Sequence, residues 1–278
     1  MPRVKHEATA CSDEVKVTDR PDLYDWLYED VKGDIPMYES LARSHTKDLE
    51  ILECGIGTGR IAIPLAQSGI TVYGIDNSPC MLQSLGDKLE NCAQEVQKRI
   101  CFREADMRDF DLKRKFPFIY VPFSTFNYLL GIDEQKASLA SIRKHLSAQG
   151  TLVLEILSFS LYSGLLVNDT HERFDKKKPA PGSNKIIEYW KRASFDSANQ
   201  LVREHRYFRY YSKGKLEHQD EVIWENRFFF LGEIMLLLEQ SGFQIEKDKE
   251  RKDRIYGDWK FGTYKHDSEF AVIVAKAT

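Results

Sequence analysis

Glycines and carboxylates stand at the ends of three consecutive predicted strands. In LEILECGIGTGRIAIPLAQSGITVYGIDNSP (49–79), Gly55, Gly57 and Gly59 follow a short buried strand, and Asp76 ends the next strand. Asp106 ends a third strand, within EADMRDF. A glycine-rich turn between a strand and a helix lets backbone N–H groups approach a ligand closely. Three such features in this order predict a nucleotide-binding site.

The type of nucleotide depends on Arg60 and Glu53. The dinucleotide fingerprint G-x-G-x-x-G requires a third glycine, but that position holds Arg60. Glu53 instead suits a ligand with an amino group and a cationic sulfonium, as in S-adenosylmethionine (SAM). Asp76 can accept hydrogen bonds from both ribose hydroxyls. SAM is therefore favoured over NAD, although each carboxylate taken alone could be a surface group, an N-cap or a turn cap.

Three motifs carry a resemblance to a known family. The chain resembles class I SAM-dependent methyltransferases from about residue 20 to its C-terminus. Their first, second and third motifs are similar to ECGIGTGR, YGIDNSPCML and ADMRDF. The lead-in YDWLYEDVKGDIPMYESLA is similar to that of small-molecule N-methyltransferases of the glycine and amino-sugar types. VPFSTF lacks the [DNS]-P-P-[YF] motif of enzymes that methylate exocyclic amines of nucleobases.

The resemblance implies SAM as the cofactor, with S-adenosylhomocysteine (SAH) as its product, and it assigns residues to it. The implied cofactor-binding residues are Tyr24, Glu53, Gly55, Gly57, Gly59, Asp76, Asn77, Met81, Asp106, Met107, Arg108 and Phe123. Methyl transfer from a sulfonium mainly requires alignment of the reacting atoms, so catalytic residues leave little trace. The candidates are Tyr28, Asn127, Tyr128 and His205. Thr125, Glu155, Tyr162, Arg203, Arg206 and Trp224 are further acceptor-side candidates.

The order of elements predicts a Rossmann-like α/β fold. Strands and helices alternate up to residue 157, which is typical of a doubly wound parallel sheet of seven strands. Helices are expected at 58–68, 79–90, 133–146 and 231–243, and Asp133 is the expected N-cap of the third. Strands are expected at 49–54, 70–76, 100–105, 117–123 and 151–157. A turn at 147–150 is expected to precede the last of these strands. The domains are a flexible arm (1–20), a SAM-binding core (21–157), an antiparallel β insert (158–230) that begins with a polar loop, and a C-terminal completion of the core (231–278).

Composition limits the partners. The 278 residues have a formal net charge of −3, so nothing indicates a nucleic-acid or membrane partner. No secretory signal, membrane span or metal-ligand cluster is recognised, and five cysteines without paired spacing indicate free thiols in the cytoplasm. We expect methylation of a small molecule, more readily at nitrogen than at oxygen, with a possible homodimer through the insert. An RNA or protein methyltransferase and a non-catalytic SAM-binding regulator remain alternatives.

Overall fold

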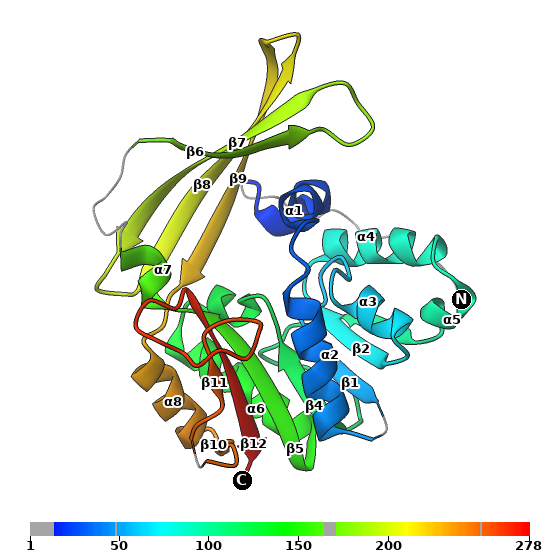
Figure 1. Cartoon of the computed structure of the whole chain (residues 1–278), viewed down its shortest axis with the longest axis vertical. Helices are drawn as coiled ribbons and strands as arrows, with labels where there is room; N and C mark the ends of the chain where they lie inside the picture. The colour runs from blue at the N-terminus through cyan, green and yellow to red at the C-terminus, as the bar shows by residue number, and fades with distance from the viewer. Residues whose placement is uncertain (1–13, 48, 164–170, 251) are drawn as a thin grey trace.

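The computed structural model describes residues 14–47, 49–163, 171–250 and 252–278. An α/β core forms the lower part of the molecule in Figure 1, and a separate antiparallel sheet lies above it. Helix α1 (Pro21–Tyr28) lies between the two. We call the antiparallel sheet the lid, defined as β6 to β9.

The core sheet has the order β10-β12-β5-β4-β1-β2-β3, with a short eighth strand, β11, beside β12. Strands β1 to β5 pair in parallel, whereas β12 is antiparallel to β5 and β10. This confirms the predicted fold. The strands are β1 (Glu50–Cys54), β2 (Thr71–Asp76), β3 (Ile100–Glu104), β4 (Phe116–Val121), β5 (Leu146–Leu157), β10 (Phe243–Ile245), β11 (Ile255–Tyr256) and β12 (Phe270–Ala277).

Apolar helix faces cover both sides of this sheet. Helix α4 begins with proline at its first position, where no backbone N–H is needed, and the Ser78 hydroxyl accepts a hydrogen bond from the Met81 N–H at 3.2 Å. The helices are α2 (Asp34–His45), α3 (Ala62–Gln67), α4 (Pro79–Glu90), α5 (Gln94–Gln97), α6 (Ile132–His145), α7 (Phe159–Ser163) and α8 (Leu231–Gln240). Within the described ranges, none of the helices is long and apolar enough to cross a membrane.

The lid is a four-stranded antiparallel meander, as predicted for the insert. Its strands are β6 (Arg173–Pro179), β7 (Ile186–Asp196), β8 (Leu201–Ser212) and β9 (Lys215–Arg227). Alternation along β8 directs Val202, Glu204, Arg206 and Phe208 to the buried face. That face packs on Leu23, Trp26 and Leu27 of α1. The apolar side of α1 therefore joins the lid to the core.

Several predicted boundaries were wrong. Helix α3 begins only at Ala62, so Pro64 lies in its first turn, where proline is tolerated. Gly131, not Asp133, is the N-cap of α6, and its N–H donates to Glu134. The expected turn at 147–150 lies inside β5, with Gln149 in a left-handed conformation. Strand β6 occupies part of the expected polar loop, because pairing with β7 overrides its low hydrophobicity.

The expected mobile arm also differs where the structure describes it. Residues 14–20 pack between the lid and the core: Lys16 forms a parallel bridge with Ile223, and the Ile223 N–H donates to the Val15 carbonyl at 2.8 Å. Val17, in the 3-10 helix η1 (Val17–Asp19), is fully buried. The remainder of the arm, residues 1–13, lies outside the described residues. The chain before α1 thus extends the lid sheet at its β9 edge.

Candidate functional site

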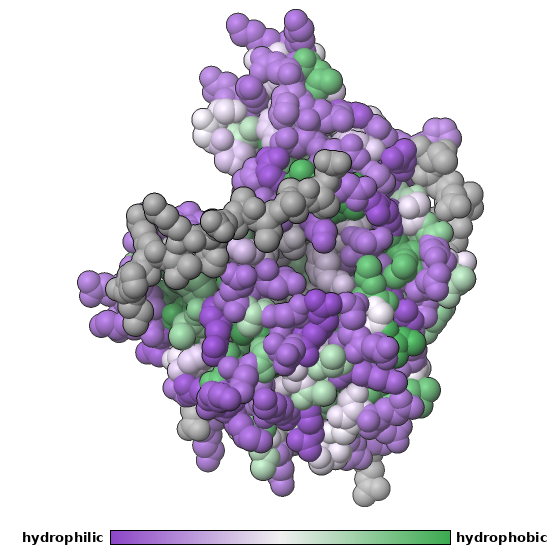
Figure 2. Space-filling view, turned by 180° about the vertical axis from the view of Figure 1, so that it is seen from behind, coloured by the Kyte–Doolittle hydropathy of each residue, from purple (hydrophilic) through white to green (hydrophobic). Residues whose placement is uncertain are grey.

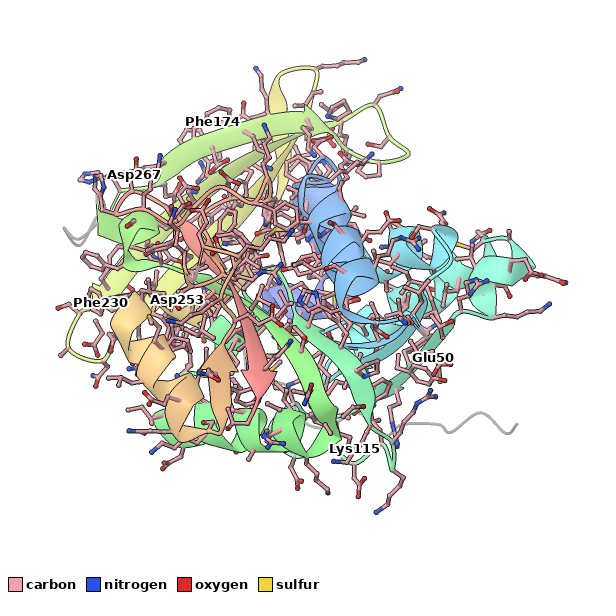
Figure 3. The ribbon with its side chains drawn as sticks, turned by 60° about the horizontal axis from the view of Figure 1, so that its bottom comes forward. Glu50, Lys115, Phe174, Phe230, Asp253 and Asp267 are labelled. Carbon is pink, nitrogen blue, oxygen red and sulfur yellow. The ribbon has the colours of Figure 1, made fainter. Side chains whose placement is uncertain are left out.

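A cavity of about 310 Å³ lies at the carboxyl edge of the core sheet, beneath the lid. Its size falls within the roughly 300–1,000 Å³ of small-molecule sites. All the predicted cofactor-binding residues line it except Glu53 and Gly59. In Figure 3, Glu50 and Lys115 lie on the core, and Phe174 lies on the lid.

The glycine loop forms the floor of this cavity. Gly57 has a φ of 53°, and a Cβ added to it would meet no atom within 4 Å, so the backbone at this residue faces open space. Gly59, by contrast, has no place in the lining. A Cβ on it would lie 2.4 Å from Leu85, so this glycine allows helix α4 to pack closely. Gly57 therefore leaves room for a ligand beside the backbone, whereas Gly59 leaves room for Leu85 of helix α4.

Asp76 is held rigidly at the end of β2. Its two carboxylate oxygens accept hydrogen bonds from the N–H groups of Gly57 at 2.8 Å and of Ser78 at 2.9 Å. Burial raises the pKa of Asp76, although these N–H donors oppose that shift. Asn77 and Met81 line the cavity beside it. A carboxylate fixed in this way is suited to accept hydrogen bonds from a ligand's hydroxyl groups.

The opposite end of the cavity is lined by residues that follow β3. The Arg108 guanidinium bonds Asp106 at 2.6 Å and also pairs with Glu134 of α6. The hydrogen bond from Arg108 holds the pKa of Asp106 below its usual value. Met107, Leu129 and Leu130 supply an apolar lining next to this ion pair. A flat apolar group with a polar edge, such as a purine, suits this end.

An aromatic wall separates the cavity from a buried arginine. Phe123, in a left-handed conformation with a φ of 49°, contacts the ring of Tyr28 edge-on at 4.8 Å between centroids. Tyr24 lines the cavity, but Tyr28 lies behind it and not in the lining. The guanidinium of Arg60 lies 4.1 Å from the Phe123 ring centre and forms a two-pronged ion pair with fully buried Asp34.

Glu53 lies below the cavity, contrary to prediction. It is 2 % exposed and accepts a hydrogen bond from the Tyr120 hydroxyl at 2.5 Å. Burial raises the pKa of Glu53 to about 8. Glu155 of β5 is similar: the Tyr38 hydroxyl donates to it at 2.6 Å, and burial raises its pKa to about 7. Both carboxyls are structural parts of the layer beneath the cavity.

The four catalytic candidates have different locations. Tyr128 lines the cavity, whereas Tyr28 lies behind its wall. Asn127 is fully buried; its amide donates to the Arg227 carbonyl at 2.6 Å and accepts from the Leu157 N–H at 3.1 Å, so its polar atoms are already used by the backbone. His205 lies outside the cavity lining and bonds Glu221 at 2.7 Å. Asn127 and His205 therefore lie outside the cavity lining, and Tyr128 is the catalytic candidate that the structure places in it.

Sequence reasoning missed the wall provided by the N-terminal segment. Lys16, Val17 and Thr18 line the cavity together with Ile223 and Glu225 of β9. The Thr18 carbonyl accepts a hydrogen bond from the Ser78 hydroxyl at 2.7 Å. No motif marks these residues, because they reach the site only through pairing with the lid. Val15 and Val17 are the two apolar residues of an otherwise polar stretch, residues 14–20.

Comparison with known proteins gives a direct result for the core. Residues 51–150 match the methyltransferase domain family. This match confirms, for that part of the chain, the resemblance predicted from its motifs. The chain is also 29% identical over 142 residues to a dTDP-3-amino-3,4,6-trideoxy-glucopyranose N,N-dimethyltransferase of Streptomyces venezuelae. That alignment covers 49% of this chain and 56% of the relative, so the chain spans about half of the curated protein's length.

Solved structures extend the likeness to the lid. The CcbJ methyltransferase of Streptomyces caelestis aligns with a TM-score of 0.78 at 20% identity, over 96% of this chain and 100% of the other. SAM-bound CalS10, an aminopentose methyltransferase of Micromonospora echinaspora, aligns with a TM-score of 0.68 at 17% identity, over 99% and 100% of the two chains. These alignments confirm the fold of the core together with the lid.

Proposed function

We propose that this protein is a SAM-dependent methyltransferase that transfers the methyl group to an amine nitrogen of a small molecule. The observation that carries the proposal is the cavity whose floor, carboxylate and apolar end follow the three motifs in chain order. The enclosing lid favours a small acceptor. The related N,N-dimethyltransferase acts, by its name, on an amino sugar, which supports nitrogen as the methylated atom.

The residues fit SAM in three places. Open space at Gly57 allows the ligand to approach the backbone, Asp76 would hold the ribose hydroxyls, and Met107 would lie against the adenine. When bound, SAM supplies an electrophilic methyl group on its sulfonium sulfur. Tyr24, Phe123 and Tyr128 then provide aromatic surface for a cationic centre and exclude water from it. The protein thereby aligns the bound ligands and excludes water from them.

The cavity lining in the described ranges includes no histidine, and its tyrosines are poor bases. Burial raises the pKa of Tyr24 and Tyr128 above the usual range of a phenol. An acceptor amine must be neutral to attack the methyl carbon. We infer that the acceptor enters as the free amine or releases its proton to solvent or to a carboxylate of the lining such as Glu225, and that the main contribution of the protein is orientation.

Two glycine substitutions test the cofactor site. Gly57→Asn keeps a residue that tolerates positive φ but places its side chain in the cavity, so we expect SAM binding to fall at least about a hundredfold. Gly69→Asn is the matched control, because Gly69 also has positive φ and open space but lies outside the cavity. Isothermal titration with SAM measures both. Normal SAM binding by Gly57→Asn would remove the cofactor site from this cavity.

The cytoplasmic location and the homodimer through the lid stay predictions. On the face shown in Figure 2, the upper part of the molecule is mostly hydrophilic, with a few hydrophobic residues. Phe174, an exposed lid residue, packs edge-on against Trp190 of the same sheet. Sedimentation of the purified protein tests the dimer directly; a monomer at micromolar concentration would contradict it.

A further inference from the structure

A second hollow lies on the core, at the opposite end of β4 from the cavity. Its lining comes from the loop before β4, from helix α6 and from the C-terminal end of α8. The cavity instead includes Phe123, which follows β4, and a strand of six residues spans roughly 20 Å. Six basic side chains define the hollow, which we call the basic groove: Lys113, Arg114, Lys115, Lys136, Arg143 and Lys144. Lys115 marks this part of the core in Figure 3.

Helix α6 contributes one of its faces to the basic groove. Lys136, Ala140, Arg143 and Lys144 follow one another at intervals of four, three and one residues, which places them along one side of a helix. Ala140 has a short side chain between long basic ones, and it leaves the middle of this face open. Helical periodicity therefore gathers half of the basic residues, and the loop before β4 adds the other half beside them.

Only part of this positive charge is neutralised within the chain. Asp111 is the one acidic residue in the described lining, and it is shared by Lys113 at 2.5 Å and by Lys144 at 3.5 Å. Arg114 forms an ion pair with Glu50, which lies outside the lining. Two carboxylates thus stand against these three basic side chains.

The other three basic residues have no acidic partner among the residues that the structure describes. The ammonium group of Lys115 lies 3.4 Å from the Leu146 carbonyl, and Arg143 donates to the Gly242 carbonyl at 3.3 Å. Lys136 is exposed and forms no ion pair with any described residue. The groove therefore has a surplus of positive charge, although the whole chain has a net charge of −3. Such a local surplus is complementary to an anionic partner.

The size and lining of the groove distinguish between anionic partners. Its open volume of about 1,320 Å³ exceeds the roughly 300–1,000 Å³ of small-molecule sites, so an extended partner fits better than a single small anion. Single-stranded nucleic acids need aromatic rings on which their bases stack. No phenylalanine, tyrosine or tryptophan in the described ranges lines the groove, and His145 is only 2 % exposed. Arg114 and Arg143 are already bonded, so the groove offers no free guanidinium fork to a phosphate.

We propose that the basic groove docks an acidic segment of a partner protein, a stretch rich in aspartate and glutamate that lies along α6. Lysine ammonium groups are compact charges on flexible stems, so they can pair with carboxylates of a segment that has no fixed geometry. The basic residues are absent from the cavity lining, so the docked segment leaves the proposed cofactor site free. This surface is therefore independent of the proposed function.

The binding test compares three labelled probes of about ten units each: decaglutamate, a Gly-Ser peptide and oligouridine RNA. Each is titrated into the full chain and followed by fluorescence anisotropy. We expect decaglutamate to bind at least about tenfold more tightly than the Gly-Ser peptide, and at least as tightly as the RNA. Its affinity should fall at least about tenfold from 0.1 M to 1 M salt, because the Debye length shortens from about 10 Å to about 3 Å.

A pair of double variants tests the location. Lys136→Gln with Lys144→Gln removes two charges from the α6 face, and we expect decaglutamate to bind about fivefold to tenfold more weakly. Lys213→Gln with Lys215→Gln is the matched control, because it removes the same charge from exposed positions of the lid hairpin, outside the groove. The control should stay within about twofold of the wild type. Both double variants should keep the SAM affinity of the wild type, which also shows that they are folded.

Three results would overturn the inference. Absence of decaglutamate binding at 0.1 M salt would remove the docking surface, and tighter binding of the RNA would assign the groove to a nucleic acid. An equal loss of affinity in the two double variants would show that net charge, and not the groove, attracts the peptide. SAM titration of the wild-type protein tests the proposed function separately, so the two proposals fail independently.

Discussion

The core side and the lid side of the cavity present different kinds of atoms to a ligand. On the core side, backbone at Gly57 and the short carboxylates of Asp76 and Asp106 face the cavity. On the lid side, Arg203, Trp224 and Glu225 present long side chains from paired strands. A short sequence motif can specify the backbone geometry that suits a cofactor shared by many enzymes. Side chains on a lid, by contrast, can differ from one acceptor to another.

The two sides also differ in how their buried arginines are enclosed, and this gives the largest expected effect. Arg60→Met leaves fully buried Asp34 without its partner, so we expect a loss of about 3–5 kcal/mol in unfolding free energy. Arg206→Met should cost less, because its partner Glu204 is 7 % exposed whereas Asp34 is fully buried. Urea denaturation measures both. Equal losses would show that the lid pair is as tightly enclosed as the core pair.

A second comparison uses glycines with the same φ of 78°. Gly59→Ala brings a Cβ to within 2.4 Å of Leu85, whereas Gly214→Ala, at the lid hairpin, meets nothing within 4 Å. We expect about 1–2 kcal/mol for the left-handed conformation at each position, and about 1–3 kcal/mol more for overpacking at Gly59. Urea denaturation of the two variants measures these free energies of unfolding. A cost at Gly214 equal to that at Gly59 would refute the packing role of Gly59.

The layer beneath the cavity predicts how stability depends on pH. Burial raises the pKa of Glu53 to about 8 and that of Glu155 to about 7, from the usual 4.5. The folded state then binds more protons than the unfolded state, so this stability is present below about pH 4.5 and is lost as pH rises towards 7 and 8. Each group contributes a slope of up to about 1.4 kcal/mol per pH unit. Glu53→Gln should flatten the profile above pH 5; an unchanged slope would contradict this origin.

The smallest expected effect concerns His205, a catalytic candidate from the sequence. His205→Ala removes a side chain on the outer side of the lid, bonded to Glu221 and outside the cavity lining. We expect kcat and KM within about twofold of the wild type and a stability change within about 0.5 kcal/mol. A large fall in kcat with unchanged stability would return His205 to the active site.

These differences explain what the sequence could predict. The floor of the cavity was predictable, because a glycine turn and the carboxylate that ends the next strand are local features. Arg60 lies within the first motif, but Asp34, its partner, could not be assigned without the packing of α2. Glu53 lies outside the cavity lining, because the position of a residue in a motif does not determine whether its side chain points into the cavity or below it. Strand β6 and the wall formed by Lys16 to Thr18 depend on pairing between distant segments, which no local pattern records.

The central claim is that the cavity binds SAM and transfers its methyl group to a small amine. Its most direct test is to add methyl-labelled SAM and the purified protein to a cell extract and to separate the products with a size-cutoff filter. The proposal predicts labelled small molecules other than SAM in the filtrate with the wild-type protein, and far less of them with Gly57→Asn. Label retained above the filter and released by nuclease or protease would indicate a macromolecular acceptor, and SAM binding without any transfer would indicate a regulator; either result would contradict the proposal.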